Sequence, residues 1–114
     1  MANQQVSQQL SSVFHGLADP TRRAVIERLS SGPAAVTELA QPFPMALPSF
    51  LQHLRVLEDC GLVTSRKSGR VRTYQLAPKP LRAASNWLEK QRALWDRRLD
   101  QLDSYLDQLK EQKS

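Results

Sequence analysis

Three prolines stand within seven residues of this chain, at positions 42, 44 and 48. A proline inside a helix removes a backbone hydrogen bond and collides with the preceding turn, so no helix interior crosses this segment. Apolar residues at helical spacing nevertheless flank it, ending near Leu39 on one side and starting again near Phe50 on the other. We therefore predict two helices joined by a stiff turn, with Pro48 in the first turn of the second helix.

The second helix of this pair, expected at 48–60, has one apolar face. At 100° per residue, Phe50, Leu54 and Leu57 form a core stripe, and Gly61 ends the helix. The side chains that point away from this stripe or flank it are Ser49, Gln52, His53, Arg55, Val56 and Asp59, with Leu47 and Leu51 on its shoulder. Taken alone, the pattern also fits an ordinary amphipathic helix with a solvated outer face.

A basic β-hairpin is expected directly after this helix. Residues 62–67 and 71–76 are rich in Thr, Val and Tyr, and they flank the bend Ser68-Gly69-Arg70. Within 62–77 there is no acidic residue, and the basic residues are Arg66, Lys67, Arg70 and Arg72. If these charges only prevented the strand edge from pairing with another chain, a mixture of acidic and basic residues would serve equally well. In a chain of net charge +5, this hairpin therefore indicates an anionic partner.

The remaining elements follow from apolar periodicity and helix stop signals. Asp19 is a suitable N-cap and Pro20 a suitable first-turn residue for a second helix. Pro78 and Pro80 are expected to separate the hairpin from a last helix. The prediction is a single, mainly α domain over 1–114 with a small β-hairpin: a first helix at 5–17, a second at 20–31, two helices and their turn at 36–60, the hairpin at 62–77 and a last helix at 81–111.

The last helix carries a heptad-like apolar seam. Leu88, Trp95 and Leu102 recur every seven residues, and Leu99 and Leu106 fall between them. Such a helix is about 45 Å long, which exceeds what so small a domain covers, so a second copy is the expected partner. The alternative is that the helix covers only its own domain. The expected dimer interface consists of Leu10 and Phe14 from the first helix and Leu88, Trp95, Leu99, Leu102 and Leu106 from the last.

The order of short helix, turn, helix and basic hairpin suits double-stranded DNA. A helix fits the major groove and presents side chains to base edges, while a basic hairpin reaches phosphates or the minor groove. Gln52 suits adenine, and Leu51 suits a thymine methyl if it tilts outward. The candidate DNA contacts are Leu47, Pro48, Ser49, Leu51, Gln52, His53 and Arg55 at the recognition helix 48–60, and Arg66, Lys67, Arg70 and Arg72 at 66–72 of the hairpin, here called the wing. A module for protein contacts is the alternative, which the wing cations disfavour.

Several motifs resemble those of a known family. They are Asp19-Pro20-Thr21-Arg22-Arg23, Glu38-Leu39-Ala40, Gln52-His53-Leu54-Arg55-Val56-Leu57-Glu58, Gly61-Leu62-Val63, Gly69-Arg70 and Tyr74. In this order they resemble the ArsR-type (arsenic-resistance-regulator) winged helix-turn-helix repressors over nearly the whole chain. The resemblance implies a homodimeric repressor of its own or an adjacent operon that binds an inverted repeat.

Two positions depart from that family pattern. Ala46 stands where a serine commonly caps the recognition helix. The lack of the serine cap is expected to lower stability by about 0.5–2 kcal/mol. Leu51 stands where a small polar residue often approaches the bases, so base readout is expected to differ.

No metal site or cofactor is expected. Zinc and softer metals require clustered thiolate and imidazole ligands, whereas the chain has one Cys and two His, and His15 falls on a different element from His53 and Cys60. The resemblance is thus to the branch without a metal site, and the motifs do not specify an effector. Cys60 is expected to act as a small buried hydrophobe, with a redox role as the alternative.

The sequence also argues against an enzyme and against a membrane protein. It lacks a glycine-rich phosphate loop, a nucleophile elbow and a close acid–base constellation. No run of 18 apolar residues is present, and the first ten residues do not follow the signal-peptide pattern. We therefore expect a cytoplasmic protein that binds DNA and itself, and no membrane.

Overall fold

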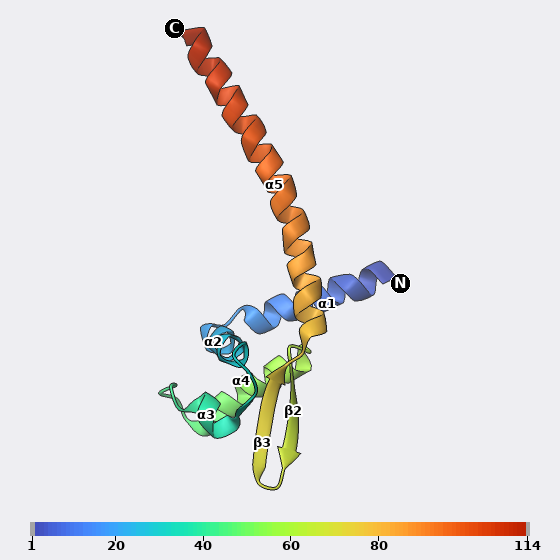
Figure 1. The fold of residues 1–114 in the computed structure, drawn as a ribbon, viewed down its shortest axis with the longest axis vertical. Coiled ribbons are helices and arrows are strands. Elements are labelled where there is room, and N and C mark those ends of the chain that lie inside the picture. Colours follow the sequence, from blue (N-terminus) through green and yellow to red (C-terminus); the bar gives the residue numbers. More distant parts are fainter. Residues whose placement is uncertain (1, 114) are drawn as a thin grey trace. The chain divides into compact units, whose positions relative to one another are not determined.

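The computed structural model describes residues 2–113, and side chains from 5 to 112. The backbone divides into two compact units, residues 1–83 and 84–114. The elements are α1 (Ala2–Leu17), α2 (Pro20–Leu29), β1 (Ala34–Ala35), α3 (Val36–Ala40), α4 (Leu47–Asp59), β2 (Val63–Ser68), β3 (Val71–Leu76) and α5 (Pro78–Lys113). Figure 1 labels all of them except the short strand β1. This mainly helical fold with a small antiparallel sheet confirms the predicted fold class.

Helix α4 forms the centre of the core in the first unit. Phe50, Leu54 and Leu57 are at most 1% exposed, as their spacing predicts. The largest other fully buried side chains belong to α1, α2, α3 and the segment between α4 and β2: Val13, Val25, Leu39 and Leu62. The proline turn is anchored to the same core, because the ring of Phe43 lies 5.3 Å from that of Phe50.

The sheet has three strands in the order β1-β3-β2. The hairpin of β2 and β3 is confirmed, and its register closes at the pair Ser68–Val71. Gly69 has a φ of +62°, and no other residue of the turn has a positive φ, which indicates a type II′ turn. The short strand β1 pairs with Thr73 and Tyr74 and was not predicted. Strand β1 thereby joins the segment before α3 directly to strand β3 of the hairpin.

The first residues of α2 and α5 test two predictions about where helices begin. Asp19 caps α2 as predicted, since its carboxylate accepts a hydrogen bond from the backbone N–H of Arg22 at 3.1 Å. The expectation that Pro78 and Pro80 separate the hairpin from the last helix is wrong. Helix α5 begins at Pro78, and both prolines lie in its first turn, where a missing N–H leaves no intrahelical bond unmade.

The second unit is the continuation of α5 from Ala84. Its large apolar side chains are exposed: Leu88 50%, Trp95 58%, Leu99 51%, Leu102 51% and Leu106 45%. Within residues 2–113, no helix combines the length and the apolar character that a membrane span requires.

Candidate nucleic-acid interface

The N-terminal half of α4 presents most of the predicted base contacts to solvent. Leu47 is 53% and Leu51 41% exposed. Pro48, Ser49, Gln52 and Arg55 are also exposed. Val56, by contrast, is half-buried, so the exposed face of α4 is centred on Gln52 and Arg55 and not on the Val56 side.

His53 is turned partly into the protein. Its Nδ1 atom lies 3.7 Å from the Asp19 carboxylate and 3.4 Å from a terminal nitrogen of the Arg22 guanidinium. The side chain is 24% exposed. One ring nitrogen therefore faces α2, and a contact from His53 to DNA would have to use the other.

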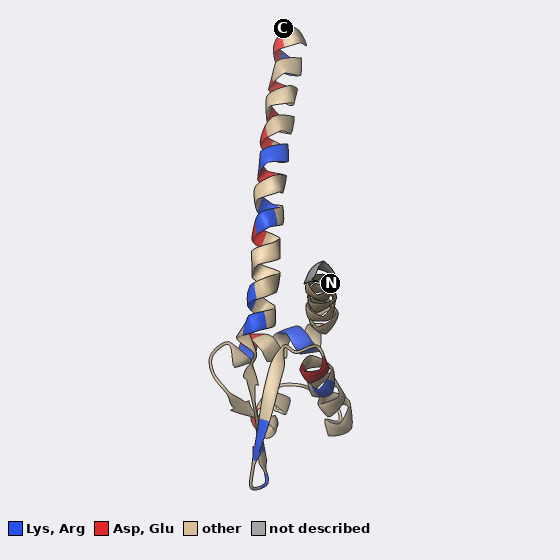
Figure 2. Ribbon diagram, turned by 90° about the vertical axis from the view of Figure 1, so that its right-hand side faces the viewer, with Lys and Arg blue, Asp and Glu red and all other residues tan. Residues whose placement is uncertain are grey.

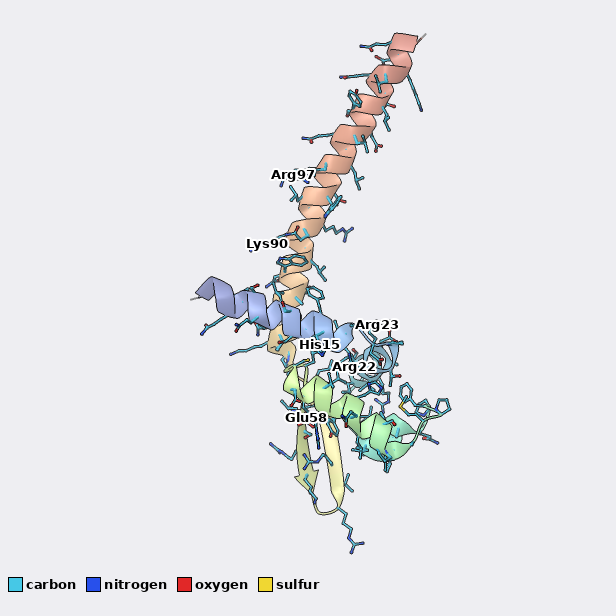
Figure 3. The ribbon with its side chains drawn as sticks, turned by 180° about the vertical axis from the view of Figure 1, so that it is seen from behind. His15, Arg22, Arg23, Glu58, Lys90 and Arg97 are labelled. Atoms are coloured by element: carbon cyan, nitrogen blue, oxygen red, sulfur yellow. The ribbon has the colours of Figure 1, made fainter. Side chains whose placement is uncertain are left out.

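Arg22 has a structural role beside this surface that the sequence analysis does not assign to it. Its Nε donates to the carbonyl oxygen of Gly16 at 2.8 Å, and a terminal nitrogen donates to that of His15 at 3.0 Å. These carbonyls belong to the last turn of α1, where the intrahelical N–H partners run out. The His15 carbonyl also accepts from the backbone N–H of Ala18 at 3.2 Å. Arg22 thus connects the end of α1, the start of α2 and His53 of α4, an arrangement we call the Arg22 junction. Figure 3 labels Arg22 and, at the end of α1, His15.

The signal for this junction was present in the sequence. Arg22 and Arg23 lie in the first turn of α2, within six residues of the last residue of α1, and cations commonly bind the last carbonyls of a helix. Arg23 does so as well, donating to Leu17 at 2.7 Å. Burial alone would raise the pKa of Asp19, but the Arg22 backbone N–H and the charges of His53 and Arg22 outweigh it and lower the pKa. Asp19 is therefore ionised where it caps α2.

The four wing cations are exposed but point in different directions. Side chains alternate along a strand, so Lys67 and Arg72, which are cross-strand partners, share the face that carries Tyr74. Arg72 also donates to the Ser65 hydroxyl at 2.8 Å, which holds its guanidinium along that face. Arg66 lies on the opposite face, and Arg70 is in the turn at the tip. Figure 2 shows this concentration of basic residues toward the end of the hairpin.

A groove runs between α4 and β3, so one wall belongs to the helix and the other to the hairpin. It is lined by Leu51, Arg55, Glu58, Asp59, Arg72 and Tyr74. Burial and the adjacent Glu58 carboxylate raise the pKa of Tyr74, so its hydroxyl stays neutral. The acidic pair Glu58 and Asp59 occupies the C-terminal end of α4, as Figure 3 shows for Glu58. These carboxylates make the C-terminal end of α4 the less favourable end of the groove for an anion.

The described residues do not favour a metal or thiol site. Among residues 5–112, no group of three or more His, Cys, Asp and Glu side chains is arranged to hold a metal ion. Burial raises the pKa of the Cys60 thiol, which lowers its thiolate fraction and its reactivity. Cys60 also contacts the tight α1 position Gly16, where a Cβ would lie 3.4 Å from the Cys60 Cβ.

Comparison with known proteins agrees with this architecture. A family model described as a helix-turn-helix domain matches residues 17–66. The HTH-type transcriptional regulator Rv2034 of Mycobacterium tuberculosis is 45% identical over 86 residues, which cover 75% of this chain and 78% of the relative. The transcriptional repressor SdpR of Bacillus subtilis is 28% identical over 79 residues, which cover 69% of this chain and 88% of the relative.

Solved structures are similar to this chain in both fold and sequence. The crystal structure of an ArsR family transcriptional regulator is similar to this chain with a TM-score of 0.73 and 53% sequence identity. The match covers 79% of this chain and 93% of the solved one. The similarity therefore extends well beyond the two helices of the recognition motif.

Proposed function

Because this chain belongs to the ArsR family of helix-turn-helix transcriptional regulators and is a DNA-binding repressor, we propose that it binds an inverted repeat as a homodimer. In this proposal, the N-terminal half of α4 contacts base edges in the major groove and the wing contacts the flanking backbone. The repressed genes are its own or an adjacent operon, and the site of action is the cytoplasm. Family membership also points away from enzymatic function.

One observation carries the assignment of the DNA-facing surface. Exposed α4 side chains and one wing cation border the same groove, with Leu51 and Arg55 on one side and Arg72 on the other. On this surface Gln52 and Ser49 are placed for base edges, and Pro48 and Leu47 for close apolar approach. The residues assigned to phosphates are Arg55, Arg66, Lys67, Arg70 and Arg72, with His53 assigned to a contact through the ring nitrogen that does not face Asp19.

The homodimer is supported by the apolar residues of α5. Trp95, Leu99, Leu102 and Leu106 follow one another at steps of four, three and four, which is the spacing of a coiled-coil seam. They are about half exposed, and a second copy would cover them. Leu10 and Phe14 of α1 complete the proposed interface, together with Leu88.

The dimer is tested by light scattering after size-exclusion chromatography. Leu102→Asp places a charge in the seam and should give a monomer. Gln101→Asp introduces the same charge one residue away, outside the seam, and should leave the dimer intact. A Leu102→Asp protein that elutes as the same dimer would refute this interface.

DNA binding is tested by selecting bound duplexes from a random pool and footprinting the product. Affinity for the selected site should fall with salt, with a log–log slope of about −0.9 per phosphate neutralised. Arg72→Ala should make that slope shallower by about that amount per half-site. Gln52→Ala should instead change the preferred sequence. Arg97→Ala, in α5, removes the same charge and serves as the control with an unchanged slope. An equal effect of Arg97→Ala and Arg72→Ala would refute the wing assignment.

A further inference from the structure

Two large aliphatic side chains are exposed on the α4 surface assigned to DNA. Leu47 and Leu51 are 53% and 41% exposed, although Phe50 and Leu54 of the same helix are almost completely buried. The core of the domain therefore does not account for leucine at either position. An apolar group of a binding partner could cover these two side chains, which contact with water does not stabilise.

The surroundings of Leu51 identify the chemistry of that partner. Leu47, Leu51 and Arg55 are four residues apart and form one ridge of the helix. Leu51 and Arg55 also line the groove that Arg72 borders from the wing. The two leucines are thus next to two guanidinium groups, which suit phosphates, while Glu58 and Asp59 line the same groove at the C-terminal end of α4.

The major groove of B-DNA offers an apolar group for these leucines. The C5-methyl group of thymine projects into it, and apolar side chains contact this methyl. The minor groove has no equivalent group. A helix that enters the major groove with a leucine ridge can therefore distinguish thymine from cytosine, and also from thymine without its methyl group.

We propose that Leu51 is a specificity-determining residue that contacts a thymine methyl in each half-site, with Leu47 packing beside it. The inference rests on the proposed function, because it requires α4 to lie in the major groove. It adds a readout that hydrogen bonding by Gln52 and Ser49 does not supply. The occupant of the ridge is then duplex DNA rather than a protein.

The test replaces single thymines in the selected operator by deoxyuridine, which keeps base pairing and removes only the methyl group. Affinities of the full-length protein are measured by fluorescence anisotropy at one salt concentration. At one position in each half-site, uracil should weaken binding of the unmodified protein about fourfold, and about fifteenfold when both half-sites are changed. Leu51→Ala should bind the thymine operator more weakly and show no difference between thymine and uracil there.

Two further variants keep the result interpretable. Leu51→Met retains an apolar side chain of similar volume and should keep most of the sensitivity to uracil. Val71→Ala truncates another exposed aliphatic residue, in the wing, and should respond to uracil as the unmodified protein does. Circular dichroism establishes that each variant is folded. If Leu51→Ala does not fold, the unmodified protein and Leu51→Met still decide the matter.

The outcomes separate the two proposals. Specific, salt-dependent binding with no uracil-sensitive position would overturn the Leu51 inference and leave the proposed function intact. The Leu51 inference would also be overturned if Leu51→Ala kept the full sensitivity to uracil, or if Val71→Ala lost it, because the methyl contact would then belong to another residue. A random pool from which no sequence is enriched would overturn both.

Discussion

The start of α4 offers a substitution with a calculable gain in stability. Ala46 is the N-cap, with φ −62° and ψ 144°, and contributes no side-chain hydrogen bond. The backbone N–H groups of Ser49 and Phe50 both donate to the Ala46 carbonyl oxygen, at 3.1 Å each. In Ala46→Ser, the new hydroxyl can accept from Ser49 and leave the carbonyl to Phe50. Pro48 has no N–H, so Ser49 is the available donor.

The expected gain lies in the lower half of the range for N-caps, because the Ser49 N–H already has a partial partner. We expect about 0.5–1 kcal/mol, which corresponds to about 2–4 °C in Tm for a domain of this size. Thermal unfolding is followed by circular dichroism at one fixed protein concentration, since a dimer makes Tm depend on concentration. Affinity for DNA should be retained.

A matched pair isolates the hydroxyl group. Ala46→Thr and Ala46→Val have nearly the same shape at this exposed position and differ by one hydrogen-bonding group. The Thr variant should melt above the Val variant by a similar amount. An Ala46→Ser protein with an unchanged or lower Tm, or equal melting of the Thr and Val variants, would refute the capping argument.

Three further predictions concern the ends of α1 and α2. The lowered pKa of Asp19 means that its ionised form adds stability above the ordinary value of 3.8, which is lost as the pH falls through the lower folded-state pKa. Asp19→Asn should therefore flatten the acid side of a pH–stability profile measured with urea, and two superimposable profiles would contradict this. Gly16→Ala places a Cβ 2.6 Å from Cδ1 of Leu62, which is 0% exposed and has little room to move. Overpacking should exceed the gain in helix propensity and lower the free energy of unfolding by about 1 kcal/mol, and Leu62→Val should offset part of the loss; a more stable Gly16→Ala protein argues against this packing. Arg22→Lys cannot bind two carbonyls with one planar group and should cost about 1–2 kcal/mol in urea unfolding, while the same change at the exposed Arg23 should cost less; equal effects would contradict the special role of Arg22.

The parts of the fold that the sequence predicts are those with local signals. Proline excludes a helix interior from 42–48, the spacing of Phe50, Leu54 and Leu57 defines the buried face of α4, and Gly69 marks the turn of the wing. Asp19 and Pro20 identify the start of α2 because capping involves neighbouring residues only. In each case the physical cause lies within a few residues of its effect.

The parts that were missed depend on residues far apart in the chain. Strand β1 consists of two alanines, which have low strand propensity and no alternation, and it exists because it pairs with Thr73 and Tyr74. The contact between Arg22 and His53 joins residues that are 31 apart in sequence. Pro78 and Pro80 were misread because proline both ends helices and begins them, and only the helix that follows decides which.

The Arg22 junction has a mechanical consequence. One guanidinium group holds the last carbonyls of α1 and lies beside His53 of α4, so the direction of α1 and the position of α4 depend on the same set of hydrogen bonds. In the proposed dimer, α1 also carries Leu10 and Phe14 of the subunit interface. A change in the angle between subunits would then be transmitted to the DNA-reading helix through Arg22, and a regulator built in this way can be controlled without any ligand bound near α4.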